Sequence, residues 1–160
     1  MHRPSARTSG LLSLLATGLI LAGLPAVAEP TGLITLRGAL TRNCDLNAVL
    51  DGPFDAIDMN STDVQGDEIL TTICNYGGTP TIEFTSLNAG VLKSGSESVP
   101  YVFIVSGGLF TGPLTTPATV FGWPVWPGLG DSRTLAIRLD FPAPVAGVYS
   151  DNITAQVTPN

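Results

Sequence analysis

Glycine and proline interrupt the chain every few residues beyond position 28, and this spacing limits what the chain can fold into. The sequence holds 18 glycines and 13 prolines among 160 residues. The segments between them alternate apolar with polar side chains and lack the longer apolar period of an amphipathic helix. This pattern predicts an all-β domain with about seven short strands, as in an immunoglobulin-like Greek-key β-sandwich. The expected strands are 33–40, 54–59, 68–74, 79–86, 100–106, 134–141 and 147–158.

The first 28 residues differ in composition from the rest of the chain. Arg3 and Arg7 precede a mostly apolar run at 11–24, and small residues end the segment at Ala28. This order of features is typical of a secretory signal peptide. A retained N-terminal helix is the weaker alternative, because the run is shorter than the roughly 20 residues that a membrane span needs. We therefore predict a signal peptide at 1–28, export through the Sec pathway, no membrane span, and one domain over 29–160.

The chain has two cysteines, Cys44 and Cys74. In an exported protein an even number of cysteines favours a disulfide, and two buried free thiols are the alternative. A bridge closing this loop would contribute about 3–4 kcal/mol in the chain-entropy model.

Several kinds of chemistry lack the residues they require. The only histidine is His2, inside the predicted signal peptide, which argues against Ser-His-Asp and Cys-His catalysis and against His-based metal sites. The net charge of −6 disfavours nucleic acid as a partner. The acidic segment 58–69 departs from the EF-hand calcium pattern, so an irregular calcium loop is only a minor alternative. We expect no enzyme activity and no cofactor. A glycosidase-like carboxylate pair remains a weaker alternative, with Asp45, Asp51, Asp55, Asp58, Glu83 and Asp140 as candidates.

The segment 122–128 reads Gly-Trp-Pro-Val-Trp-Pro-Gly, and two prolines so close together exclude a central strand. Its rings could cap one end of the core, which is the usual role of large aromatic side chains. Alternatively, Trp123 and Trp126 could form an exposed contact patch. With Tyr101 they would then serve as stacking platforms in a secreted, monomeric, carbohydrate-binding module.

Three stretches of the sequence resemble one known family. Residues 31–44 read TGLITLRGALTRNC, residues 145–158 read VAGVYSDNITAQVT, and the middle contains CNYGG from Cys74. Together they are similar to the spore coat protein U family and to the related archaic chaperone–usher pilins. In that family the last strand follows an Ala-Gly-Thr-Tyr-Ser-Asp motif with alternating Thr and Val. This chain departs from it at Asn152, Ala155 and Gln156.

The resemblance implies a sandwich that lacks its final strand and is completed by another chain. Such pilins are structural subunits of a surface fibre or coat. Their partners are a periplasmic chaperone, an outer-membrane usher and other pilin-like subunits, and they pass through the periplasm to the cell surface. By this analogy 29–40 is the candidate donor strand, although 33–40 could instead be the domain's own first strand. The donor row would be Ile34, Leu36, Gly38 and Leu40, and the last strand would line the acceptor groove with Tyr149, Ile153, Ala155 and Val157.

Overall fold

The computed structural model describes residues 36–48 and 53–160 of the chain. Ala39–Asn160 form one compact unit, and residues 36–38 belong to a separate N-terminal unit. The predicted signal peptide at 1–28 lies outside the described residues. The described chain is all-β, apart from one short 3-10 helix, η1 (Pro53–Ala56). The strands are β1 (Cys44–Ala48), β2 (Val64–Cys74), β3 (Thr81–Ser86), β4 (Val91–Ser94), β5 (Glu97–Val105), β6 (Phe110–Gly112), β7 (Ala118–Val120), β8 (Asp131–Leu139) and β9 (Ile153–Thr158).

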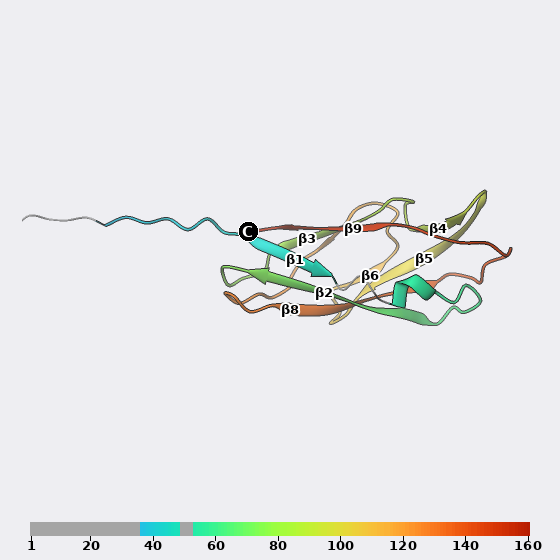
Figure 1. Cartoon of the computed structure of the whole chain (residues 1–160), viewed down its shortest axis with the longest axis horizontal. Coiled ribbons are helices and arrows are strands. Elements are labelled where there is room, and N and C mark those ends of the chain that lie inside the picture. Colours follow the sequence, from blue (N-terminus) through green and yellow to red (C-terminus); the bar gives the residue numbers. More distant parts are fainter. Residues whose placement is uncertain (1–35, 49–52) are drawn as a thin grey trace, which may run out of the picture. The chain divides into compact units, whose positions relative to one another are not determined.

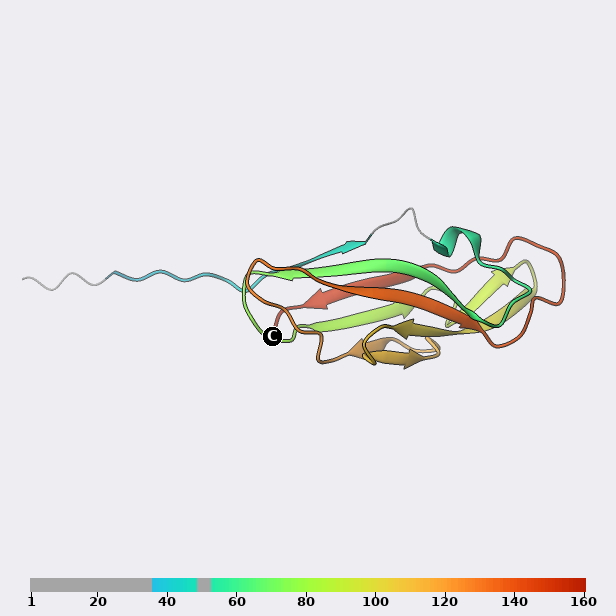
Figure 2. The ribbon, with the colours of Figure 1, turned by 90° about the horizontal axis from the view of Figure 1, so that it is seen from below.

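The strands form two antiparallel sheets. The larger, six-stranded sheet has the order β1-β2-β8-β5-β4, with β6 paired to β5, and it curls into half a barrel. The smaller sheet has the order β7-β3-β9. Figure 1 shows β3 and β9 along one side of the molecule and β2 and β8 along the other. Figure 2 shows β2 and β8 running together along the length of the larger sheet.

The core lies between the two sheets and follows the period-two alternation of the strands. In β5, Val99, Tyr101, Phe103 and Val105 are buried, and the residues between them are half-buried. Phe103 meets Phe84 of the smaller sheet, with ring centroids 5.0 Å apart. The side chains that join the sheets therefore come from strands distant in the sequence.

The Cys44–Cys74 disulfide is confirmed, and it joins the first residue of β1 to the last residue of β2. The two cysteines are directly opposite each other in the antiparallel register. Because β1 is an edge strand of five residues, this covalent bond reinforces a short ladder of hydrogen bonds.

Some strand predictions were wrong. Segment 54–59 contains part of η1 instead of a strand. The helix η1 begins at a proline, a residue type that is tolerated in the first turn of a helix and disfavoured inside a sheet. Residues 36–40 and 147–152 lie outside the strands, so the last strand begins only at Ile153. The edge strands β1, β4, β6 and β7 were not predicted, because runs of three to five residues carry too little alternation.

Candidate functional site

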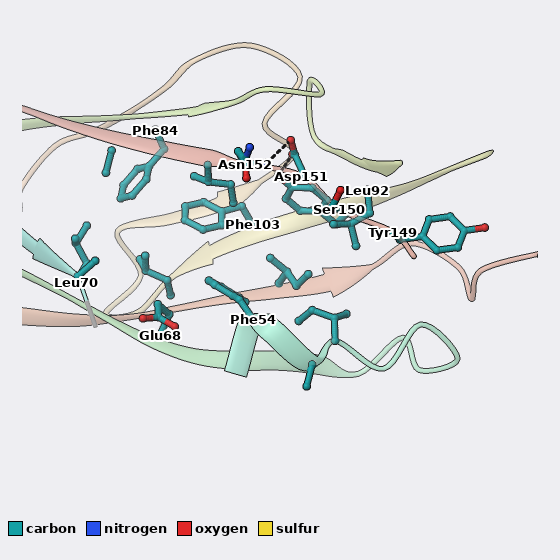
Figure 3. Close-up of a pocket in the computed structure, with 18 of the residues that line it drawn as sticks. Phe54, Glu68, Leu70, Phe84, Leu92, Phe103, Tyr149, Ser150, Asp151 and Asn152 are labelled. Atoms are coloured by element: carbon teal, nitrogen blue, oxygen red, sulfur yellow. Dashed lines mark hydrogen bonds between the residues drawn. The ribbon is translucent and has the colours of Figure 1, made fainter. Parts of the chain in front are cut away.

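A groove opens between the two sheets, with a volume of about 870 Å³ (Figure 3). We call it the inter-sheet groove. On the larger sheet its walls include Leu46 of β1, Leu70 of β2 and Ile137 of β8. On the smaller sheet they include Phe84 of β3 and Ala155 of β9. The groove is therefore lined mainly by apolar side chains that would otherwise belong to the interior of the domain.

The strand β9 forms one edge of the groove. It pairs with β3 along one side, from Thr81 opposite Thr158 to Ser86 opposite Ile153, and no described strand is hydrogen-bonded to its other side, although β1 lies near it. Its inward row is only half-buried, whereas the inward row of β3 is buried. A strand edge with free backbone groups beside uncovered apolar side chains is suited to pairing with a further strand.

The structure brings together most of the last-strand residues predicted from the sequence. Tyr149, Ile153 and Ala155 line the inter-sheet groove. Val157 is half-buried and packs against the core, but it is not part of the groove lining. Tyr149 precedes β9, and its hydroxyl donates a hydrogen bond of 2.9 Å to the Val145 carbonyl.

The chain just before β9 crosses from one sheet to the other and closes one end of the groove. Ser150 pairs with Lys93 of β4 through two backbone hydrogen bonds of 3.0 Å, and β9 then joins β3. Asp151 holds this crossing in place. Its Oδ2 accepts hydrogen bonds from Ser86 Oγ at 2.5 Å and Tyr101 Oη at 2.7 Å.

The second carboxylate oxygen of Asp151 binds the backbone. Its Oδ1 accepts from the amides of Asn88 at 2.9 Å and Asn152 at 2.8 Å. Burial, and after it the hydrogen bond to Asp151, raises the pKa of Tyr101 above its ordinary value. The neutral phenol is thus the form that the fold accommodates.

A β-bulge in β2 sets which residues of that strand face the groove. The register with β8 shifts by one residue between Gln65, opposite Ile137, and Glu68, opposite Leu135. Gly66 lies within the bulge at a φ of 86°, which favours glycine, and a side chain there would overlap the ring of Phe54. The bulge places Glu68 in the groove lining, a position that was not predicted from the sequence.

The Trp-Pro segment divides between two environments. Trp123 is fully buried, so its proposed part in an exposed contact patch was wrong, and its ring packs in the core. Trp126 is 54% exposed. Tyr101 is 1% exposed, which removes it as a stacking platform for a sugar. Trp126 alone retains the exposure that such a platform requires.

The candidate donor row is only partly described. Ile34 lies outside the described residues, and Leu36 and Gly38 fall in the N-terminal unit. Leu40 belongs to the compact unit, is 82% exposed and lies in no strand. The donor role of this row stays a prediction.

Across 36–48 and 53–160, no cluster of three or more His, Cys, Asp or Glu side chains could hold a metal ion. Within the same ranges, no helix has the length and hydrophobicity to cross a bilayer. Asp51 and the side chain of Asp55 lie outside the described part. The other candidate carboxylates are exposed and do not line the inter-sheet groove; they are Asp45, Asp58, Glu83 and Asp140.

Comparison of the chain with protein-family models found no match, and comparison with curated proteins found no significant match.

Proposed function

We propose that the chain is a structural subunit of a surface fibre (pilus) or coat, and that another chain completes its fold by adding a strand. The domain is then an immunoglobulin-like sandwich that lacks its final strand. The observation that carries the proposal is the inter-sheet groove beside the unpaired edge of β9. A periplasmic chaperone fills the groove first, and at the outer-membrane usher a neighbouring subunit replaces it by donor-strand exchange.

The energetics of the groove favour a strand as its occupant. An added strand gives β9 the backbone hydrogen bonds that it lacks on its outer side. Side chains at alternate positions of that strand enter the groove and cover Ile153 and Ala155. Burying three aliphatic side chains would contribute about 5–8 kcal/mol before the cost of ordering the strand. Left open, the same surface favours aggregation, which is a reason for a chaperone to cover it.

The donor that this chain offers to its neighbour is the segment 29–40. Ile34, Leu36 and Leu40 have the period of two that an inserted strand requires, and Gly38 lies in the same row. Export follows from the signal peptide at 1–28. The proposal therefore assigns the chain one acceptor surface, the groove, and one donor segment.

The test compares two triple variants of the full chain that alter opposite faces of the donor segment. Ile34→Asn, Leu36→Asn and Leu40→Asn change the inward row, and Thr35→Asn, Arg37→Asn and Ala39→Asn form the matched outward control. Each protein is denatured, refolded and analysed by size-exclusion chromatography and by gel electrophoresis with and without heating.

We expect heat-resistant oligomers from the wild type and from the outward control, and their loss from the inward variant. Stable monomers from all three proteins would refute strand exchange through this segment. They would then favour the secreted monomeric binding module, for which loss of sugar binding in Trp126→Ala is the direct test.

A further inference from the structure

Glu68 is a buried carboxylate in the apolar wall of the inter-sheet groove. Its residue is 8% exposed, and its Oε1 atom has no hydrogen-bond partner among the described residues. Figure 3 shows the carboxylate between Leu70 and Phe54, within the groove. A buried, unpaired carboxylate oxygen destabilises the protein. Among the described residues, the groove therefore lacks a hydrogen-bond donor at Glu68 as well as apolar atoms to cover its lining.

Gln65 lies on the other side of the β2 bulge, and its side-chain amide finds all its hydrogen-bond partners within the chain. Its Nε2 donates to the carbonyls of Asp58 at 3.0 Å and Ser61 at 3.3 Å, and its Oε1 accepts from the Asp58 amide at 2.7 Å. The turn at 58–61 therefore satisfies Gln65 completely. No corresponding turn reaches Glu68 within the described part of the chain.

The donor segment of this chain is a poor match for that carboxylate. Its inward row of Ile34, Leu36, Gly38 and Leu40 carries no side-chain N–H or O–H group. A second copy inserting this row would cover Glu68 with carbon and leave Oε1 unpaired. The hydrogen-bonding mismatch, together with the negative charge of Glu68, points to a different occupant.

Resting on the proposed function, we propose that the strand filling this groove comes from a different protein and presents a hydroxyl, amide or amine side chain to Glu68. The apolar lining supplies general affinity for an extended strand. Glu68 then discriminates between strands, because a site built around a polar group rejects partners that leave this group unpaired. Self-insertion then occurs in the purified protein, where no such strand competes, and an unlike subunit takes the acceptor side where its strand is present.

The experiment measures peptide capture by the full chain, diluted from denaturant into an excess of fluorescent peptide. The parent peptide copies residues 29–42, and four further peptides carry glutamine in place of Ile34, Leu36, Gly38 or Leu40. A control peptide carries glutamine at Thr35, on the outward face. The proteins are wild type, Glu68→Leu and the matched control Glu83→Leu, which alters an exposed glutamate of β3. Fluorescence polarisation gives each dissociation constant.

We expect Glu68→Leu to bind the parent peptide about tenfold more tightly than wild type does, which corresponds to about 1.4 kcal/mol. We also expect glutamine at one inward position of the peptide to favour binding to the wild type over binding to Glu68→Leu. Relative to the parent peptide, this preference should amount to about tenfold in the dissociation constant. The Glu83→Leu protein and the outward glutamine peptide should show neither effect.

If circular dichroism shows that Glu68→Leu does not fold, Glu68→Gln replaces it, with lysine at the inward positions of the peptides. The amide keeps the shape but lacks the charge, so one lysine peptide should bind wild type about tenfold more tightly. Capture of the parent peptide without coupling to residue 68 at any position would overturn the role of Glu68 alone. If the wild type captures none of the peptides, this inference and the proposed function are both overturned.

Discussion

Replacing Asp151 with alanine should destabilise the segment that crosses between the two sheets, and the hydrogen bonds of Asp151 indicate the size of the loss in stability. The Asp151 carboxylate accepts side-chain hydrogen bonds from Ser86 and Tyr101 and backbone hydrogen bonds from Asn88 and Asn152. Alanine removes all of these acceptors at once. The Tyr101 hydroxyl loses its partner in a residue that is otherwise buried, where water has little access.

The expected loss follows from the partners left behind. A buried hydroxyl without a hydrogen-bond partner lowers the free energy of unfolding by about 1–3 kcal/mol. Each hydrogen bond to a charged group raises it by about 1.5–3 kcal/mol. Asp151 is only half-buried, so water replaces part of what its backbone partners lose. We expect Asp151→Ala to lower the free energy of unfolding by about 3–5 kcal/mol. Asp151→Asn keeps the shape and one acceptor oxygen, and should cost about 1–2 kcal/mol.

Urea unfolding of the full chain with its disulfide intact measures these losses. The fluorescence of the buried Trp123 reports the transition. Asp140→Ala is the control, because that carboxylate is exposed and no hydrogen bond to its side chain is present in the described part of the chain. The midpoint should fall strongly for Asp151→Ala and stay within about 0.5 kcal/mol of wild type for Asp140→Ala. Equal effects of the two substitutions would refute a structural role for the Asp151 cluster.

Three further outcomes are expected. Replacing Cys44 and Cys74 together with serine should lower stability by about 3–4 kcal/mol, given a sequence separation of 30, and a urea midpoint unaffected by reductant would contradict this. Because the fold raises the pKa of Tyr101, its neutral phenol stabilises the protein below about pH 10, and this contribution declines as the pH rises further. The stability difference between wild type and Tyr101→Phe should accordingly shrink above that pH in urea titrations, and a constant difference would rule out the linkage. Gly66→Ala should cost about 1–3 kcal/mol through its positive φ and its overlap with Phe54, whereas an unchanged midpoint would show that the bulge adapts freely.

Alternation in the sequence was informative about the long strands. The expected segments 68–74, 100–106 and 134–141 overlap β2, β5 and β8, each of which is nine residues or longer. Each has a neighbour on both sides in the sheet, so its pattern reflects burial directly. The disulfide was likewise predictable, because only one pairing of two cysteines exists.

Which face of β2 is buried was harder to predict from the sequence. The alternation places Ile69, Thr71 and Ile73 on one face of β2. The buried row is the opposite one, with Glu68, Leu70, Thr72 and Cys74. Apolar identity alone misleads here, because the outward row carries more β-branched residues than the inward row does. The bulge at Gly66 also changes which residues face inward, and a glycine within a strand pattern is the sequence signal that could have revealed it.

The groove itself could be anticipated only in part. The half-buried row of β9 could be proposed from its alternation and its resemblance to a family. The other wall could not, because it depends on residues from β1, β2 and β8 that meet only in three dimensions. Trp123 illustrates the same limit, since nothing in its local sequence separates a buried ring from the exposed ring of Trp126.

The position of the disulfide determines how the domain would carry a mechanical load. A pull on the chain just before Cys44 does not have to be resisted by the five-residue ladder of β1, because the sulfur bridge passes it directly to β2. β2 is held in turn along its length by β8, so tension spreads across the middle of the larger sheet. A linkage of this kind resists peeling of its edge strand, as the proposed fibre subunit would require under shear.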